Sequence, residues 1–381
     1  MDEPNYKTPG QYIEALLDAH GWSKRVLSIV LDIDETVINK ILAGKRTVDA
    51  NIALLLAEIF QVEAETFIGL QKAYDLAQAR IVARPDSGRA IRATLFGKLP
   101  VTEMVKRGWL DADDIRDVPK VEAALTKFFG EKSVNQIEVL PHAAKKTNTC
   151  TPATPVQIAW IYRVREIASE MLVPRYSTEG LREGVRRLNR LLSAPEEARN
   201  VPRILAECGI RYVIVESLAS AKIDGVCFWL NDHSPVIGMS LRHDRIDNFW
   251  FVLRHEIEHV LRQHGQIQNA IMLDAELEGE KAGTGSSISE EERVANESAA
   301  NFCVPQQSLK SFIARKSPFF NERDILGFAK TLGIHPGLVA GQLQRHTNRY
   351  DLFRQHLVKI RATVAPSATV DGWGDVAPVG R

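Results

Sequence analysis

Residues 254–259 have the sequence Arg254-His255-Glu256-Ile257-Glu258-His259, which contains the pattern His-Glu-x-x-His. In a helix, side chains four residues apart lie on the same face, so both imidazoles can reach one metal ion. Glu256 would then lie beside a water molecule at that metal and act as its general base. The pattern predicts a zinc site with His255 and His259 as ligands, and a helix with two unrelated histidines is the alternative.

The residues around this pattern predict a largely buried helix. Asp247 is a candidate N-cap, and the apolar run Phe249-Trp250-Phe251-Val252-Leu253 follows it. Ile257, Val260 and Leu261 continue the apolar positions at helical spacing. The two histidines are therefore expected among core residues rather than on an open surface.

A third ligand is expected on a second helix, because catalytic zinc usually binds three protein side chains. Residues 290–302 predict a helix, which would be stopped near Pro305. Glu292 is the candidate ligand, and Asn296, one turn later, could orient a ligand histidine through its other ring nitrogen. Glu291 is the alternative ligand, and the acidic start of this helix also stabilises the helix dipole.

The composition is that of a folded globular protein: of 381 residues, 45% are apolar and 25% charged, with a formal net charge of zero. This length predicts two or three domains, and the zero net charge indicates no general preference for polyanions. No apolar run is long enough to span a membrane and the N-terminus lacks a signal-peptide pattern, so we expect a cytoplasmic protein without a membrane partner. The four cysteines form no C-x-x-C pair, which argues against a disulfide framework and against cysteine-bound zinc.

The first 80 residues predict a compact helical unit. Its expected helices cover residues 10–20, 24–30, 35–43 and 51–60. Ser23 and Asp34 are candidate N-caps of the second and third helices, and Gly44 would close the third. Two short helices joined by a tight turn predict a helix-turn-helix DNA-binding domain over residues 1–80.

Residues 9–80, including Ile41-Leu42-Ala43-Gly44-Lys45-Arg46, resemble the HigA-like, lambda-repressor-type helix-turn-helix domains. The resemblance implies that residues 35–43 form the recognition helix for a double-stranded DNA operator. The side chains that it implies for DNA contact are Thr36, Val37, Asn39 and Lys40 in the major groove, with Lys24, Lys45 and Arg46 nearby. Lys24 stands where such domains often carry a glutamine, so a phosphate contact there would come from a lysine.

The charge of this unit tempers the DNA-binding prediction. Residues 1–80 contain 8 Lys and Arg against 12 Asp and Glu, a net charge of 8 − 12 = −4. Nucleic-acid binders usually carry a basic surface. The basic residues nevertheless cluster around the two motif helices, and the alternative is a domain kept for dimerisation or for docking a partner.

Residues 81–150 predict a helical spacer without recognisable chemistry, and residues 151–361 a metallopeptidase-like domain. In this domain, helices are expected over 156–172 and 179–192, followed by a strand that ends at Val215. Strands 225–230 and 236–241 would form a hairpin directly before the histidine-bearing helix. An edge strand there could bind an extended peptide by main-chain pairing, and an ordinary core hairpin is the alternative.

The order of motifs in this half is similar to that of the ImmA/IrrE family of metallo-endopeptidases. The motifs are Val236-Ile237-Gly238-Met239-Ser240-Leu241, Asp244-Arg245-Ile246-Asp247-Asn248-Phe249-Trp250-Phe251, the His-Glu-x-x-His stretch, Glu292-Arg293-Val294-Ala295-Asn296 and Val304-Pro305. The resemblance spans about residues 155–346, and it implies an α+β, zincin-like fold with a small β-sheet.

The same resemblance implies Zn²⁺ bound by His255, His259 and Glu292, with Glu256 as the general base. It also implies a helix-turn-helix repressor, cut at one site, as a frequent substrate. Ser298, where the family commonly has an aromatic residue, and Phe302-Cys303, in place of an aliphatic pair, depart from the family pattern. These departures do not touch the expected ligands.

Three further features bear on the expected site. His335, in Ile334-His335-Pro336-Gly337, is a candidate donor to the oxyanion, and capping of the following helix is its alternative role. His243 and His264 are expected to be structural or exposed. The Gly- and Ser-rich residues 276–289 predict a mobile loop near the zinc helix, and residues 362–381 predict a disordered tail.

Together these features predict a cytoplasmic regulator that joins a DNA-binding unit to a zinc endopeptidase of narrow specificity. The expected partners are operator DNA, a helix-turn-helix repressor or antitoxin-like protein as the substrate, a toxin, and a second copy of the chain in a homodimer. The alternative is a non-proteolytic repressor or HigA-like antitoxin whose metal-binding domain senses a ligand or a partner.

Overall fold

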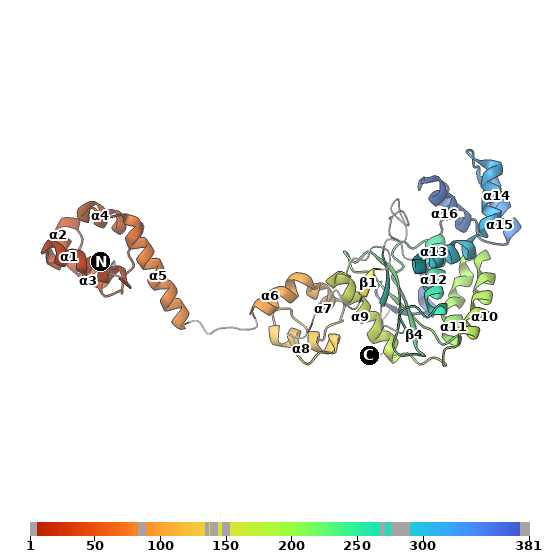
Figure 1. The fold of residues 1–381 in the computed structure, drawn as a ribbon, viewed down its shortest axis with the longest axis horizontal. Coiled ribbons are helices and arrows are strands. Elements are labelled where there is room, and N and C mark those ends of the chain that lie inside the picture. The colour runs from red at the N-terminus through yellow and green to blue at the C-terminus, as the bar shows by residue number, and fades with distance from the viewer. Residues whose placement is uncertain are drawn as a thin grey trace. The chain divides into compact units, whose positions relative to one another are not determined.

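The computed structural model describes residues 6–82, 89–133, 137, 144–146, 153–266, 271–275 and 290–373. The chain divides into two compact units, Met1–Arg89 and Ala90–Arg381. Figure 1 shows the helices of the first unit in red to orange and the mixed second unit in light orange to blue. The expected loop at residues 276–289 lies outside the described residues.

The described part of the N-terminal unit is helical. Its helices are α1 (Pro9–His20), α2 (Lys24–Leu31), α3 (Glu35–Leu42), α4 (Ala50–Phe60) and α5 (Ala64–Val82). Their apolar faces meet in one core around Ile13, Leu56 and Phe67, each at most 1% exposed. This burial explains why sequences of only eight residues, such as α2 and α3, hold a helical conformation.

Local sequence explains where the two short helices begin. The Ser23 hydroxyl accepts a hydrogen bond from the Val26 N–H at 3.3 Å, and the Asp34 carboxylate accepts one from the Thr36 N–H at 2.7 Å. Gly44 follows α3 with a φ of 65°, a left-handed conformation that favours glycine. The predicted helix-turn-helix of α2 and α3 is therefore confirmed.

The expected helical spacer is part of the C-terminal unit. Its helices α6 (Arg89–Lys98), α7 (Val101–Lys106) and α8 (Val118–Phe129) share one apolar core with α9 (Pro155–Glu170) and with one face of the β-sheet. Met104, Leu125 and Trp160 lie in this core, each 0% exposed. Arg107 also donates hydrogen bonds to the carbonyls of Glu216 and Ser217, at 2.8 and 3.1 Å. These helices are a packed layer of the domain rather than a separate spacer.

A mixed sheet forms the centre of this unit. Its strands are β1 (Ala144–Lys146), β2 (Arg211–Val215), β3 (Ile223–Trp229), β4 (Pro235–Met239), β5 (Ile271–Ala275) and β6 (Thr369–Asp371). They are ordered β1-β5-β3-β4-β2-β6. Pairs β3–β4 and β3–β5 are antiparallel, and pairs β2–β4, β2–β6 and β1–β5 are parallel.

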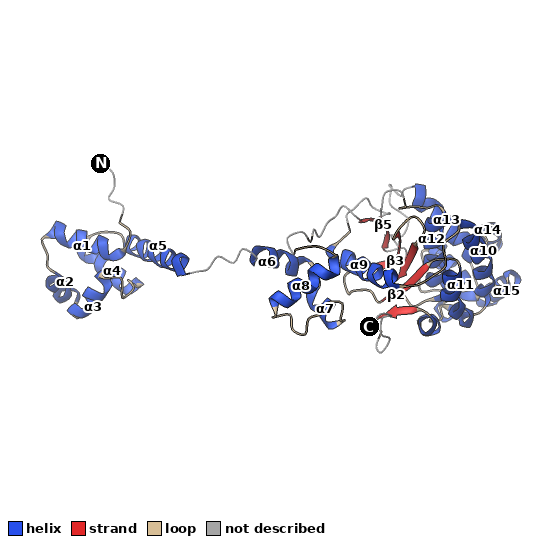
Figure 2. Cartoon of the chain, turned by 90° about the horizontal axis from the view of Figure 1, so that it is seen from below, coloured by secondary structure: helices blue, strands red, loops and turns tan. Residues whose placement is uncertain are grey.

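The two faces of the sheet bury different helices because side chains alternate along each strand. Val213, Val226 and Val236 belong to the core that α8 and α9 cover. Ile214, Cys227 and Ile237, one residue further along, belong to the core that contains α12 (Ile246–Leu261). Figure 2 shows the strands between α9 on one side and α12 on the other. The predicted α+β class with a small sheet is confirmed.

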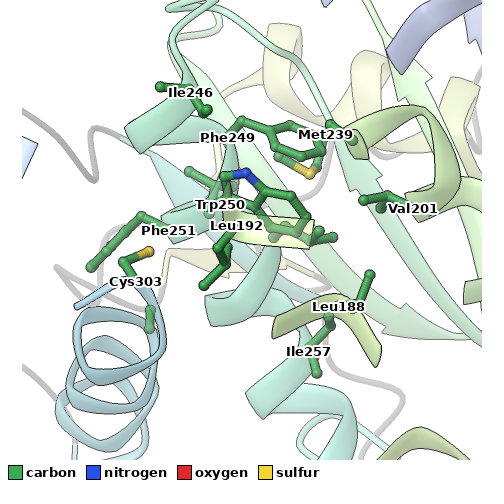
Figure 3. Packing of buried hydrophobic residues seen from close by; sticks show 14 of the residues in the cluster. Leu188, Leu192, Val201, Met239, Ile246, Phe249, Trp250, Phe251, Ile257 and Cys303 are labelled. Atoms are coloured by element: carbon green, nitrogen blue, oxygen red, sulfur yellow. The ribbon is translucent and has the colours of Figure 1, made fainter. Parts of the chain in front are cut away.

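The second of these cores is the larger, and the histidine-bearing helix α12 runs through it. Trp250 of α12 is 0% exposed and lies among side chains of other elements, including Met239, Leu192 and Cys303 (Figure 3). The remaining helices around this core are α10 (Thr178–Asn189), α11 (Val201–Glu207), α13 (Glu290–Cys303), α14 (Gln306–Lys316), α15 (Glu322–Leu332) and α16 (Pro336–Thr347), with 3₁₀ turns η2 (Arg190–Ser193), η3 (Pro195–Asn200) and η4 (Arg354–His356). The apolar packing of its other side chains fixes the direction of α12.

The prediction of an edge strand before α12 is wrong. The hairpin of β3 and β4 forms as expected, but β4 pairs with β3 on one side and with β2 on the other. Its backbone donors and acceptors are therefore used inside the sheet, and the core-hairpin alternative applies. A hydrophobic strand pattern does not distinguish these cases, because the second neighbour comes from β2, about twenty residues upstream.

The prediction of a disordered tail over residues 362–381 is also wrong for the part that the structure describes. Residues 361–371 contain α17 (Arg361–Val364), the 3₁₀ turn η5 (Ala365–Ser367) and β6, which pairs with β2. Asp371 in β6 accepts a hydrogen bond from Arg163 Nε of α9 at 2.5 Å, with both side chains largely buried. A three-residue strand has no recognisable periodicity, and its order comes from this pairing. Residues 374–381 lie outside the described part.

Membrane-spanning length and apolarity do not occur together in any helix among the described residues.

Candidate metal centre

The first turn of α12 places the metal-site helix. Arg245, with an extended backbone, occupies the N-cap position without a side-chain cap, so the prediction of Asp247 as the N-cap is wrong. Asp247 lies within the first turn, is 7% exposed and accepts a hydrogen bond from Arg245 Nε at 3.1 Å. A Cβ at Gly341 of α16 would lie 2.7 Å from Asp247 Cβ, so α16 approaches α12 closely here. This contact anchors the helix ahead of its histidines.

The structure brings His255, His259 and Glu292 together, as the sequence predicted. The Nε2 atoms of the two histidines are 3.0 Å apart. Glu292 of α13 has one carboxylate oxygen 3.1 Å from His259 Nε2 and the other 3.4 Å from His255 Nε2. All three residues are 0% exposed, and their potential ligand atoms lie within 4.8 Å of one another. The alternative ligand, Glu291, is exposed.

This donor set fits a zinc ion. Two imidazole nitrogens and one carboxylate are the ligands of one common class of catalytic zinc site, which leaves a further position for water or substrate. Taking a carboxylate out of water is unfavourable unless a positive charge compensates it. A divalent cation between the three side chains would supply that charge, which explains why such polar groups converge in the core.

Glu256 lies next to this group and against strand β3. It is 0% exposed, and a Cβ at Gly225 of β3 would lie 2.9 Å from its carboxylate carbon. Only glycine leaves room for the glutamate side chain at this point of the strand. The register of β3 against β5 shifts between Ile223 and Gly225, as at a β-bulge.

Buried ionic contacts fix the strand beside Gly225. Asp224, with a side chain that is 1% exposed, accepts hydrogen bonds from Arg242 Nη2 at 2.9 and 3.1 Å and from Arg242 Nε at 3.1 Å. The hydroxyl of Ser240 donates to the carbonyl of Ile223 at 2.5 Å. His243 Nε2 lies 3.9 Å from Asp224, and burial lowers the pKa of His243. These contacts tie the loop before α12 to the start of β3.

The comparisons with known proteins bear on this half of the chain. Residues 207–323 match the family model described as the IrrE N-terminal-like domain, Peptidase_M78. This segment is similar to the IrrE N-terminal-like domain. The matched residues include α12 and α13, with His255, Glu256, His259 and Glu292. The resemblance to the ImmA/IrrE family is thereby confirmed over this segment, and the chain carries a domain of a metallopeptidase family.

An addiction module antidote protein of a HigA (higA) family from Coxiella burnetii is similar among solved structures. It is 29% identical in sequence, the match covers 20% of this chain and 95% of that chain, and the TM-score is 0.18. None of the curated proteins matches the chain.

One residue that the sequence analysis expected to be structural or exposed lies next to the metal centre. His264, in the turn after α12, has its Nδ1 atom 2.8 Å from Nδ1 of His259. Burial lowers the pKa of His264, and the neighbouring His259 lowers it further. Its position five residues after His259, directly before Gly265, is the available sequence signal, since a glycine there allows the chain to fold back.

The structure does not support the roles expected for Asn296 and His335. Asn296 makes no side-chain hydrogen bond to the described residues and lines a cavity of about 510 Å³ between α13, α14 and α16. His335 is the N-cap of α16. Its ring Nδ1 accepts a hydrogen bond from the Gly337 N–H at 3.1 Å, and its backbone N–H donates to the Leu192 carbonyl at 2.7 Å. The capping alternative therefore applies.

Another buried network lies along α12 beside the metal centre. Glu258, 7% exposed, accepts hydrogen bonds from Arg254 and Arg262, each at 2.7 Å. Burial alone would raise the pKa of Glu258, but these hydrogen bonds outweigh it and hold the pKa below its usual value. The Glu258 carboxylate therefore stabilises the helix through these two arginines. Its hydrogen bonds involve neither His255 nor His259.

Apart from Lys24, which is the first residue of α2, the expected DNA-contacting residues occupy α3 and the turn after it. Thr36, Asn39, Lys40, Lys45 and Arg46 are exposed. Val37 is only half-exposed and packs against the core of the unit.

Two of the predicted DNA contacts have partners within the chain. The Thr36 hydroxyl donates to the Asp34 carboxylate at 2.6 Å, and hydrogen bonds from Thr36 lower the pKa of Asp34. Lys24 Nζ lies 3.4 Å from Glu14. Asn39, Lys40, Lys45 and Arg46 are therefore the better candidates for contact with a nucleic acid.

Proposed function

We propose that this protein is a regulator in which a DNA-binding helix-turn-helix unit is joined to a zinc-dependent endopeptidase of narrow specificity. The carrying observation is the convergence of His255, His259 and Glu292 within 4.8 Å of one another, all 0% exposed. Glu256, the neighbour of His255, supplies the general base that peptide hydrolysis requires. The match of this segment to a peptidase family supports the same activity.

The residues would divide the chemistry among them. His255 and His259 bind Zn²⁺ through Nε2, and Glu292 binds it through its carboxylate. When bound, the ion supplies Lewis-acid activation of a peptide carbonyl and of a water molecule. Glu256 accepts a proton from the attacking water and delivers it to the leaving amine nitrogen, so the proton is conserved over the reaction. The absence of a side chain at Gly225 gives the Glu256 carboxylate its place beside the ligands.

The substrate that we propose is a helix-turn-helix repressor or an antitoxin-like protein, as the family resemblance implies. A fused helix-turn-helix unit would bring the peptidase to an operator that such a protein also occupies. Asn39, Lys40, Lys45 and Arg46, all exposed, would contact this operator. We further propose that the protein acts in the cytoplasm as a homodimer, since operators with two half-sites bind dimers; a toxin is a further proposed partner.

Metal analysis and a cleavage assay on matched variants test the proposal. Wild-type protein should contain close to one zinc per chain and cut one candidate repressor at one site. Glu256→Gln should keep the zinc and lose the cut, because the amide cannot accept the proton. His259→Ala should lose both. If wild-type protein holds no zinc, or if Glu256→Gln cuts as fast as wild type, the endopeptidase proposal is wrong.

A second function is favoured by the closed environment of the centre. Strand β3, which contacts Glu256 through Gly225, is paired with β4 on one side and β5 on the other, so its backbone offers no free edge for a peptide. A repressor whose metal centre senses a ligand or partner without proteolysis agrees with this closure. Operator binding and regulation that survive Glu256→Gln, but not Lys40→Ala, would favour this second function over the first.

A further inference from the structure

The turn after α12 folds the chain back onto the metal-site helix. Gln263 has a φ of 59° and Gly265 a φ of 75°, both left-handed, so the backbone reverses within a few residues. The His264 N–H donates to the carbonyl of His259 at 3.0 Å, and the Gln263 N–H donates to the carbonyl of Val260 at 3.0 Å. The His264 side chain is therefore returned to the side of the helix that carries His259.

A residue of the β-sheet holds this turn in place. Trp229 of β3, 6% exposed, donates from its indole N–H to the carbonyl of His264 at 3.1 Å. The Trp229 ring packs edge-on against Tyr176 at 5.4 Å between centroids, and the Tyr176 hydroxyl donates to the carbonyl of Val260 at 3.4 Å. Trp229 thus fixes the backbone of His264, and Tyr176 packs against Trp229 and holds the last turn of α12.

The side-chain contact joins Nδ1 of His259 to Nδ1 of His264, and zinc binding would decide which of the two nitrogens donates. A zinc-binding nitrogen carries no proton, so a neutral His259 that binds through Nε2 has its proton on Nδ1. That N–H lies 2.8 Å from Nδ1 of His264, which can accept it only in the tautomer protonated on Nε2. His264 would therefore act as the acceptor that holds the imidazole ring of His259 with Nε2 toward His255 and Glu292.

We propose that His264 is a positioning residue of the metal centre, which accepts a hydrogen bond from His259 Nδ1 and so orients His259 Nε2 for zinc. This inference rests on the proposed zinc site and adds a residue to it. Ligand histidines generally donate their second N–H to an acceptor, which is usually a carboxylate, a carbonyl or water. In this protein the acceptor is another histidine, supplied by the turn that Trp229 holds.

The test uses variants that move or remove the acceptor. In His264→Asn the amide oxygen can stand near the place of Nδ1, whereas in His264→Gln it extends to the place of Nε2, and His264→Leu has no acceptor. The affinity for zinc alone, measured by competition with a chromogenic chelator, should fall about 10- to 100-fold in the Leu and Gln variants and recover in the Asn variant. The visible spectrum of the cobalt-substituted protein should change in the same two variants.

Controls separate this role from a merely structural one. His346→Leu removes an exposed imidazole and should leave zinc affinity unchanged. The unfolding temperature of each zinc-free variant measures any general loss of packing. Such a loss would not single out the Leu and Gln variants and spare the Asn variant. Equal zinc affinities in wild type and His264→Leu, or equal losses in all three variants, would overturn the inference while the zinc site stands. A wild-type protein that binds no zinc would overturn both.

Discussion

A Cβ atom on Gly225 of β3 would lie 2.9 Å from the carboxylate carbon of Glu256, so the strand touches the metal-site helix where it has no side chain. The contact couples two features that are separate in the sequence, a glycine in a β-bulge and a glutamate in a His-Glu-x-x-His pattern. It determines where the carboxylate can stand relative to His255 and His259. The first prediction follows from it.

Gly225→Ala should reduce cleavage by about 100-fold or more, since a positioned general base contributes about 10²- to 10⁴-fold. The added methyl group must displace the Glu256 carboxylate, while the zinc ligands, on other side chains, keep their places. Zinc content and cleavage rate are the measurements. Gly327→Ala, where a Cβ meets nothing within 4 Å, is the matched control. A Gly225→Ala protein that cuts at the wild-type rate would contradict the expected contact.

Removal of zinc should destabilise the C-terminal unit. A ligand that binds only the folded state adds about 2.7 kcal/mol of stability when its free concentration is 100 times its Kd. The unfolding temperature should therefore rise with added zinc in the wild-type protein and stay constant in Glu292→Ala, which lacks one ligand. Unfolding temperatures that do not respond to zinc in the wild type would show that the three buried residues do not form a metal site.

Stability should depend on the protonation of His335. Burial lowers the pKa of His335, His356 lowers it further, and Glu196 opposes this effect. The neutral ring accepts the Gly337 N–H at the start of α16, and protonation removes this acceptor. Because the unfolded state protonates first, stability should be full above about pH 6.5, the ordinary value for histidine, and should fall as the pH drops below it.

The variant that checks this is His335→Asn, which keeps an N-cap acceptor without a titrating group. Its free energy of unfolding in urea should fall less than that of the wild type between neutral and mildly acidic pH. His346→Asn, an exposed histidine, serves as the control. Parallel pH profiles for wild type and His335→Asn would contradict the role of the ring as a neutral cap.

Asp371→Asn should destabilise the C-terminal unit by about 3 kcal/mol, because it leaves the buried Arg163 guanidinium without its buried partner. Arg163 retains Glu166, which is 43% exposed and compensates less well. Urea unfolding measures the change. Asp351→Asn, which removes an ion pair with Arg349 in which both side chains are more than 60% exposed, should change stability little. Equal stabilities of the wild type and Asp371→Asn would mean that the contact between Asp371 of β6 and Arg163 does not stabilise this unit.

The proposed DNA contacts of Lys40 and Arg46 should make the affinity for DNA depend on the salt concentration. Loss of one phosphate contact lowers the slope of log affinity against log salt by about 1. Lys40→Ala or Arg46→Ala should each do so, whereas Lys72→Ala on α5 should not. Fluorescence anisotropy with duplex DNA at several salt concentrations is the measurement. Binding that is equally weak and equally salt-dependent in all variants would remove these residues from the interface.

The local features of the chain were predictable from its residues. The spacing of His255 and His259 and the acidic residue on the next helix predicted the three side chains that converge in the core. Ser23 and Asp34 predicted the starts of α2 and α3. Helix periodicity and capping depend on residues within a few positions, so these signals survive without knowledge of the fold.

Only the tertiary structure decided which elements become neighbours. β4 is an inner strand because β2 pairs with it, and β6 is ordered because β2 and Arg163 hold it. His335 caps a helix and His264 reaches His259, although both are histidines outside the central pattern. The sequence by itself determined the donor atoms and the helix that carries them. Long-range pairing and close packing, which no local pattern encodes, decided which residues support those donors and leave room for Glu256.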